Sequence, residues 1–416
     1  MRIKLKAVSS YDVGLVAITI VAVVAFIFVL ITLSPEATTA PRHSQLKYLV
    51  EDESTLDFNS VTQVPAGKWT AVSSPVNLGM HTDVYWFSLV VSPSKNKESR
   101  TLLHIDYPLI DFLDVGVYRS IGSTPIVTYS GGDNQPLSER PLQHVKPIFP
   151  LPQSTESQRI FIRVQTSGTV RLPIRIWEER EFITYTSSRN LALGIFFGFL
   201  LAMGVSNAFL TVAARHASFM YYTGYVLSLV LSLSALHGYG YSYLWADNVW
   251  FQSKSILLFS NATILFAAMF TRSLLPIKQH SVTLDKIAQG IGWVCGISMV
   301  ACLFLPYYFM IKAFLLLLSA IVLFTLGLGI WLISRGVVVA RYFTIAWAFL
   351  LISGLSASLD NVNLVDLPIS SNNLLIIGGA VETLILALIL AVNYSHSRDD
   401  LISAQQFALE QEKQAN

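Results

Sequence analysis

Charged side chains are scarce in this chain of 416 residues. Asp, Glu, Lys and Arg make up 13% of it, whereas hydrophobic residues make up 53%. Because soluble proteins carry about 25% charged residues, much of this surface must face lipid. The formal net charge is only +2 and no basic tract occurs, which argues against electrostatic binding of nucleic acid. We therefore expect a membrane protein with no nucleic-acid partner.

Cysteine and catalytic signatures are also scarce. The two cysteines, Cys295 and Cys302, share one apolar stretch and would lie about 10 Å apart along a helix, too far for a disulfide. No G-x-S-x-G or HExxH motif occurs, and His81, His104 and His144 lack metal-ligand spacing. We expect no catalytic residue, no metal and no cofactor in these 416 residues. A longer protein could still carry a kinase or diguanylate cyclase activity.

Long apolar runs are abundant. The first, 13–33, comes after Arg2, Lys4 and Lys6. It exceeds the roughly 7–15 apolar residues of a signal peptide and reaches the length of about 20 that spans a bilayer. The sequence thus favours a retained anchor in segment 1–33 over a cleaved signal, and either one would export the domain after it. Seven further spans are predicted at 190–212, 218–239, 251–270, 287–305, 309–333, 341–359 and 373–394.

The direction of the spans can be inferred from the basic residues near their ends. Cytoplasmic loops of membrane proteins are enriched in Lys and Arg. If 34–189 lies outside, the outer connections contain Lys254 and Lys312, and the inner ones contain Arg215, Arg272, Lys278, Lys286, Arg335, Arg341 and Arg398. We therefore place 34–189 outside the membrane and the carboxyl terminus in the cytoplasm.

Between 41 and 180 the apolar runs become short and rich in β-branched and aromatic residues. Gly, Pro, Ser and Asn separate them, which is typical of strands joined by turns. The sequence predicts an exported all-β sandwich of jelly-roll type. Its strands are expected at 84–91, 101–107, 112–119, 125–129, 145–151, 159–165 and 170–177.

Within this domain, exposed aromatic rings could stack on a sugar, although core packing is the alternative for each. The candidate ligand-binding residues are Trp86, Tyr107 and Arg140. Three carboxylates, Asp106, Asp111 and Asp114, are expected to be solvated ends of strands, with paired carboxylates as the alternative.

Polar residues also occur inside the predicted bilayer. Glu382 sits near the middle of the last span, where an acidic residue costs about 2.5–3.5 kcal/mol on insertion scales. It should face the bundle, either protonated or beside a donor, and we expect Asn207, Asn261 or His237 to be that donor. A structural hydrogen bond and a role in signalling both remain open. Arg341 completes the candidate intramembrane and signalling set.

An ordered set of motifs extends over roughly 350 residues. The membrane half contains 198–210 (GFLLAMGVSNAFL), 236–245 (LHGYGYSYLW), 270–275 (FTRSLL), 340–347 (ARYFTIAW) and 378–382 (GGAVE), with Tyr221 and Tyr222 between them. The exported half contains 85–87 (YWF), 115–118 (VGVY), 131–133 (GGD), Arg140, 161–167 (FIRVQTS) and 172–177 (LPIRIW).

These motifs resemble the bacterial seven-transmembrane receptors with diverse intracellular signalling modules, and their second type of extracellular domain. Segment 390–394 (LAVNY) departs from the family, which usually has an acidic and a basic residue there. The resemblance implies a bacterial inner membrane, with 34–189 in the periplasm. It also implies sensing of a small-molecule ligand outside, by a domain similar to carbohydrate-binding jelly rolls.

The region after Arg398 is polar and helix-forming, with apolar or small residues at 3–4 spacing. We expect the bundle at 187–395 to continue into a cytoplasmic helix at 396–416 that pairs two protomers in a parallel homodimer, a solvated tail being the alternative. Segment 408–416 (ALEQEKQAN) resembles the linker into hybrid histidine kinases.

The leading hypothesis is therefore a sensory receptor with a histidine-kinase output and a response-regulator partner. A diguanylate cyclase output is one alternative. A transporter-like bundle that uses Glu382 for coupling is another.

Overall fold

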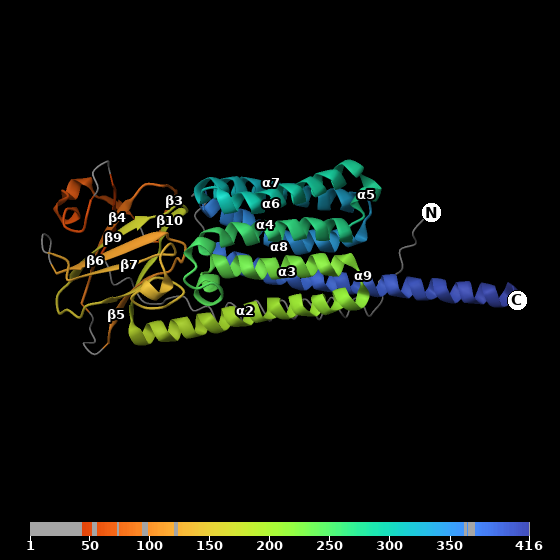
Figure 1. The fold of residues 1–416 in the computed structure, drawn as a ribbon, viewed down its shortest axis with the longest axis horizontal. Helices are drawn as coiled ribbons and strands as arrows, with labels where there is room; N and C mark the ends of the chain where they lie inside the picture. The colour runs from red at the N-terminus through yellow and green to blue at the C-terminus, as the bar shows by residue number, and fades with distance from the viewer. Residues whose placement is uncertain are drawn as a thin grey trace.

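A computed structural model describes residues 44–51, 56–72, 75–93, 99–119, 124–361, 364 and 371–415. The predicted anchor at 13–33 lies outside the described residues. A β-domain occupies one end of the molecule, a bundle of long helices adjoins it, and α9 extends beyond the bundle at the far end (Figure 1).

The described strands of the β-domain all pair antiparallel. Their order is β2-β1-β4-β9-β6-β7 in a six-stranded sheet, β11-β5-β8 in a three-stranded sheet and β10-β3 in a pair. Their bounds are β1 Leu46–Val50, β2 Thr70–Val72, β3 Val76–Met80, β4 Tyr85–Val91, β5 Thr101–Ile105, β6 Phe112–Tyr118, β7 Val127–Gly131, β8 Ile148–Leu151, β9 Gln158–Gln165, β10 Thr169–Leu172 and β11 Ile174–Glu178. Short 3-10 turns occur at Val61–Gln63, Ala66–Lys68 and Leu137–Glu139.

Alternation along the strands places apolar residues on both faces of the six-stranded sheet. In β4, Phe87 and Leu89 face the other sheets and join the main core of the domain. Trp86 points to the opposite face, where it packs with Val61 and Phe161 under the segment that carries the 3-10 turns. Because successive side chains of a strand point to opposite faces, a strand with apolar residues on both faces can be buried on both.

The expected single strand at 170–177 is divided between two sheets. Residues before Pro173 form β10 and pair with β3, whereas those after it form β11 and pair with β5. Proline has no N–H to donate to a ladder, so the chain changes partners at this residue. Strands β1, β2 and β3 were not predicted, and they are only five, three and five residues long.

Within the described residues, seven helices are long and apolar enough to cross a membrane. The predicted fold class, a seven-helix membrane bundle with an exported all-β sandwich, is thus confirmed. The helices are α2 Glu179–Ala214, α3 Ala217–Leu236, α4 Val249–Leu274, α6 Val282–Phe304, α7 Tyr307–Ser334, α8 Val338–Asn361 and α9 Ser371–Ala415, with short elements η4 Gly240–Leu244 and α5 Ile277–His280.

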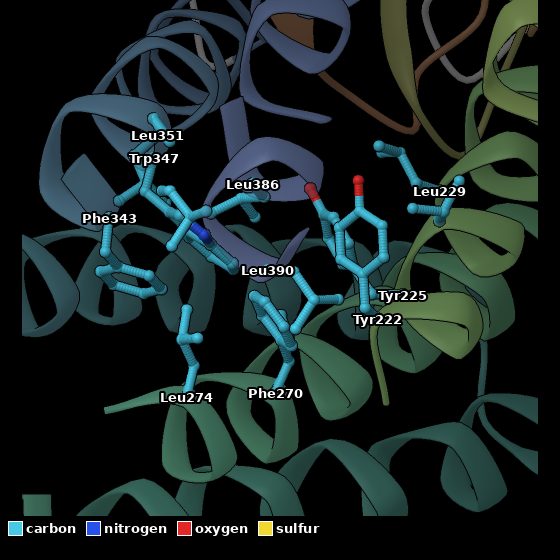
Figure 2. Close-up of a cluster of buried hydrophobic side chains, with 14 of the residues drawn as sticks. Tyr222, Tyr225, Leu229, Phe270, Leu274, Phe343, Trp347, Leu351, Leu386 and Leu390 are labelled. Carbon is cyan, nitrogen blue, oxygen red and sulfur yellow. The ribbon is translucent and has the colours of Figure 1, made fainter. Parts of the chain in front are cut away.

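Aromatic side chains from several helices form the inner core of the bundle (Figure 2). Tyr225 of α3 stacks on Trp347 of α8 with ring centroids 5.7 Å apart, and Tyr222 packs on Phe270 of α4 at 5.3 Å. Where α8 and α9 cross, a side chain at Gly378 would meet the α8 backbone, 2.9 Å from a carbonyl oxygen. Small residues at such crossings let membrane helices approach closely.

The position of Trp86 gives the first prediction. Its side chain is fully buried, and its Nε1 donates to Glu51 Oε2 at 2.8 Å. Trp86→Ala should therefore lower the free energy of unfolding of the β-domain by about 3–5 kcal/mol, and Trp86→Phe by less. Hydrogen exchange of peptides from β4 and β9 in the full chain measures this. Trp250→Ala, at a tryptophan that is 60% exposed, is the control, and equal protection in both variants would contradict a core role.

Candidate functional site

A cavity of about 270 Å³ lies between the β-domain and the outer ends of the helices. Its wall comes from both halves of the chain, so the cavity exists only where the β-domain meets the bundle. Its polar members from the β-domain are Tyr107, Asp111, Asp133, Asn134, Ser167 and Thr169, and those from the helices are Gln252, Ser253 and Tyr307.

Backbone contacts hold the two aspartates of this wall next to each other. The amide of Asp133 donates to Ile110 O at 2.8 Å, and that of Asn134 donates to Asp111 O at 3.1 Å. Directly before Asp133, Gly132 has φ +129°, and a Cβ there would lie 2.3 Å from Asp111 O. Only glycine fits this turn, and the close approach fixes Asp133 beside Asp111.

Neutral donors satisfy the two carboxylates. Asp111 Oδ2 accepts from the amide and the hydroxyl of Ser167 at 2.8 and 2.6 Å. Asp133 Oδ2 accepts from Gln252 Nε2 of α4 at 3.2 Å, which links the β-domain directly to the bundle. Burial, together with the charge of Asp111, raises the pKa of Asp133 to about 7, against the opposing effects of Gln252 and Arg140.

The structure brings two of the three predicted ligand-binding residues to this region. Tyr107 lines the cavity. Arg140 lies behind it and donates to Gly132 O at 2.6 Å and to His144 O at 3.2 Å, so it supports the Gly132 turn. Trp86 lies elsewhere, in the core on the far face of the six-stranded sheet.

Sequence reasoning missed Asp133 and Gln252 as site residues and treated Asp111 as a solvated strand end. The motif at 131–133 was the available signal, because two consecutive glycines before an aspartate indicate a tight turn that aims its carboxylate.

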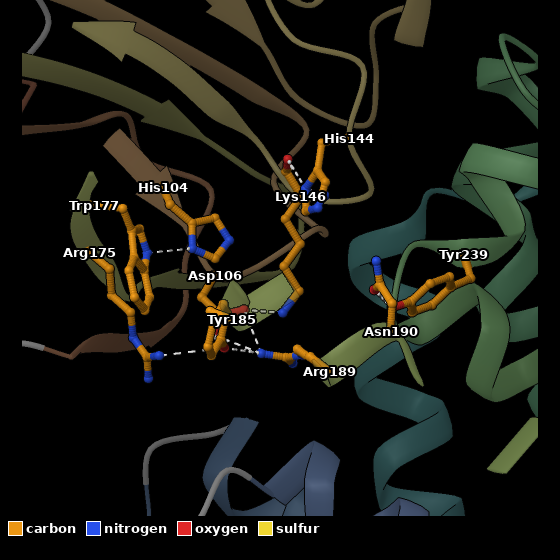
Figure 3. Close-up of polar contacts among 10 residues, drawn as sticks. All are labelled: His104, Asp106, His144, Lys146, Arg175, Trp177, Tyr185, Arg189, Asn190 and Tyr239. Carbon is orange, nitrogen blue, oxygen red and sulfur yellow. Dashed lines mark hydrogen bonds and ion pairs between the residues drawn. The ribbon is translucent and has the colours of Figure 1, made fainter. Parts of the chain in front are cut away.

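A cluster of buried charges links the β-domain to α2 (Figure 3). Asp106, just after β5, forms an ion pair with Lys146 and contacts Arg189 Nη1 of α2 at 3.1 Å. Arg189 also donates to Tyr185 OH at 2.6 Å, and Arg175 of β11 donates to the same hydroxyl at 3.4 Å. The expectation that Asp106 is solvated is wrong, because its side chain is only 11% exposed.

Electrostatics in this cluster favour the ionised carboxylate. Burial alone would raise the pKa of Asp106, but the charges of Lys146 and Arg189 outweigh it and hold that pKa well below its usual range. Burial lowers the pKa of Lys146 to about 8, so its ammonium group is still mostly charged at neutral pH. His104 is different: burial lowers its pKa to about 3, and it stays neutral.

Inside the bundle, Glu382 is fully buried. Its Oε2 accepts from Tyr225 OH of α3 at 2.8 Å and from Thr383 Oγ1 at 3.3 Å. Among the described residues none forms an ion pair with it. A charge without a partner would be costly there, so the arrangement fits a neutral carboxylic acid that ties α9 to α3.

The donors predicted for Glu382 are occupied elsewhere. Asn207 and Asn261 donate to the carbonyls of Met203 and Leu257, one turn back in their own helices. His237 caps α3 through a contact of its Nδ1 with Leu233 O. Arg341 is exposed near the start of α8.

The geometry defines a multi-pass membrane protein in which an exported β-domain sits on seven helices and shares a cavity with them. The family model described as 7TM diverse intracellular signalling matches residues 189–393, and the model described as 7TMR-DISM extracellular 2 matches residues 43–178. The chain belongs to the seven-transmembrane receptors with diverse intracellular signalling modules, and it carries their second type of extracellular domain. It is therefore a transmembrane sensory receptor. A comparison with curated proteins gives no match.

The charge cluster gives a prediction about stability. Asp106→Asn would leave Lys146 and Arg189 without their counter-charge, which costs roughly 3–5 kcal/mol for a buried pair. Thermal unfolding of the full chain measures this. Asp83→Asn is the control, since Asp83 is exposed and lies 3.9 Å from His81, and it should cost less than about 1 kcal/mol.

The same carboxylate sets a pH dependence. Because folding lowers the pKa of Asp106, its stabilisation is present above the unfolded-state pKa of about 3.9. It is lost as the pH falls through the lower folded value. If Asp106→Asn is as stable as the parent chain at neutral pH, the role assigned to Asp106 is contradicted.

A further prediction concerns the intramembrane carboxyl group. Tyr225→Phe removes only the hydroxyl that donates to Glu382, and should destabilise the bundle by about 1–3 kcal/mol. Glu382→Gln keeps an acceptor oxygen and should cost less than Tyr225→Phe. Unfolding of the detergent-solubilised chain compares both with Tyr342→Phe, at a tyrosine that is 44% exposed. A larger loss in Glu382→Gln than in Tyr225→Phe would show that an ionised carboxylate is needed.

Proposed function

We propose that this receptor binds a small molecule in the cavity between the β-domain and the bundle, on the outer side of a bacterial inner membrane. Binding changes a cytoplasmic output through the helices. The observation that carries the proposal is the two-sided wall of the cavity, with Asp133 from the β-domain bonded to Gln252 from α4. A ligand that touches both halves has different affinities for different relative positions of the two, and that difference is all that a ligand can use to shift a conformational equilibrium.

The distribution of basic residues supports this orientation. Arg272 lies in the last turn of α4, and Arg215 and Arg335 come directly after the ends of α2 and α7. The short helix α5 lies at the end of the bundle away from the β-domain (Figure 1), and it carries Lys278. Basic residues gather at the cytoplasmic side of membrane proteins, so the β-domain faces outward and α9 leaves the bundle in the cytoplasm.

A series of contacts connects the β-domain to α9. The ion pair of Asp106 with Arg189 connects the β-domain to α2, and α2 packs on α3. The hydrogen bond from Tyr225 to Glu382 then connects α3 to α9. Since α9 is a single helix of 45 residues, about 68 Å long at 1.5 Å per residue, a shift within the membrane moves its far end as well.

The far end of α9 supports a helical partner. Ile402 and Phe407 are 40% and 62% exposed, and apolar residues on a solvated helix are suited to a parallel pairing of two protomers. A homodimer that drives a histidine kinase and its response regulator agrees with the linker-like sequence at 408–416, and a diguanylate cyclase is the alternative output. A carbohydrate-like ligand, implied by the type of exported domain, stays a prediction.

A fusion of residues 1–416 to a histidine-kinase output tests the function. Ser138 N donates to Asp247 Oδ1 at 3.1 Å across the junction, so Ser138→Cys with Asp247→Cys can be oxidised to fix the β-domain on the bundle. Cys295 and Cys302, both buried, are first replaced by alanine. Oxidation should change autophosphorylation about fivefold or more, the lower end of usual coupling strengths.

Single-cysteine variants under the same oxidation are the control, and reduction should restore the parent rate. Deletion of 41–180 should also change the output. If both the cross-link and the deletion leave autophosphorylation unchanged, the exported domain does not regulate this chain.

A further inference from the structure

The wall of the interdomain cavity carries negative charge with no cation of its own. Asp111 and Asp133 both line it, and among the described lining residues none is a lysine, arginine or histidine. The groups that donate to these carboxylates, Ser167 and Gln252, are neutral, and neither aspartate forms an ion pair with a described residue. Two half-buried carboxylates on one cavity wall favour a cationic occupant, because charge that is partly removed from water and left without a partner is costly.

Arg140, a cation close to Asp133, is already engaged. Arg140 stands behind the turn that carries Asp133, and its guanidinium donates to the carbonyls of Gly132 and His144. It also lies over the ring of Tyr241, 5.7 Å from the centroid. It offsets part of the charge of Asp133 from outside the cavity, so two ionised carboxylates still leave one negative charge in excess.

The rest of the wall suits an organic cation. Tyr107 and Tyr307 line the cavity from opposite halves of the molecule, and tyrosine rings attract ammonium groups. Apolar side chains such as Leu109 and Ile311 can cover a short carbon chain. Within the described residues no cluster of three or more His, Cys, Asp or Glu side chains could hold a metal ion.

We propose that the interdomain cavity is a binding site for a small organic amine, whose ammonium group lies against Asp111 and Asp133. This inference rests on the proposed function, because the cavity is the same. The volume of about 270 Å³ is just below the roughly 300–1,000 Å³ of drug-sized sites, which fits a diamine or an amino alcohol. The amine replaces the missing counter-charge and touches α4 and α7 as well as the β-domain.

Binding of an amine should depend on pH through Asp133. Burial and the neighbouring Asp111 raise its pKa to about 7. The other polar groups that face Asp133 are Gln252, Arg140, Tyr241 and Tyr307. An amine prefers the ionised carboxylate, so it must displace a proton at low pH. Linkage of one proton with a pKa of about 7 makes the affinity about tenfold higher at pH 8 than at pH 6.

The experiment uses the full chain in lipid nanodiscs and three probes of one length: butane-1,4-diamine, butane-1,4-diol and succinate. Isothermal titration calorimetry at pH 8 should show saturable binding of the diamine only. Asp111→Asn and Asp133→Asn should each weaken it at least tenfold, whereas Asp83→Asn, at an exposed aspartate, should leave it unchanged. In the parent chain the affinity should fall about tenfold between pH 8 and pH 6, and in Asp133→Asn this dependence should vanish.

Several results would overturn the proposal. Equal or tighter binding of the diol, of succinate, of glucose or of calcium ions would remove the amine preference, and so would diamine binding that both Asn variants retain. If neither the diamine nor choline, an alcohol with a quaternary ammonium group, binds, the proposal is also rejected. These failures differ from failure of the proposed function: glucose binding that Gln252→Ala abolishes would keep the receptor and its cavity, while an output indifferent to the interdomain cross-link would reject the receptor mechanism whatever binds.

Discussion

The covalent passage from sheet to helix constrains the rest of the structure. Strand β11 ends at Glu178 and α2 begins at Glu179, so no linker separates the exported domain from the first membrane helix. Trp177 of the strand stacks on Tyr185 of the helix with ring centroids 4.8 Å apart, and Phe182 packs into the same cluster. A flexible linker would let the domain turn freely. At this junction, by contrast, the sheet and α2 must change their orientation together.

Buried charge at the same junction favours a few distinct positions of the β-domain over a continuous range. Asp106, Lys146 and Arg189 come from a strand end, a loop and a helix, and they satisfy one another only in one arrangement. Separating a buried pair leaves a charge with neither water nor partner, so intermediate positions of the domain cost more than either a closed or a fully hydrated one. Packed interfaces of this kind change between alternatives rather than deform continuously. The cavity lies at the same interface between the β-domain and the bundle, so the ligand proposed above would act on the same positions of the domain.

The sequence predicted the elements of this molecule far better than its polar contacts. Membrane spans are set by length and apolar composition, which are local, and all seven were found. The charge of Asp106 depends on Lys146 and Arg189, which are 40 and 83 residues away along the chain, so no local pattern could show that it is buried. Pro173 lies where the chain passes from one sheet to another. The change of sheet became visible only from the strand pairing with β3 and β5. For Glu382 the donor was Tyr225, a residue that counts as apolar in a hydrophobic run, while the amides that were expected to donate bond to their own helices.

The intramembrane hydrogen bond and the length of α9 together decide what kind of motion can leave the bundle. A neutral pair such as Tyr225 and Glu382 acts only over hydrogen-bond distance, so it holds α9 to α3 at one height while permitting small rotations about that point. At Gly378 the backbones of α8 and α9 approach closely, so a turn of α9 would take place against α8. An uninterrupted helix keeps its own backbone hydrogen bonds during such a turn, so rotation costs less than bending. This arrangement favours a rotation or a small shift of α9 over bending, and the parallel helix pair proposed above would respond to that motion.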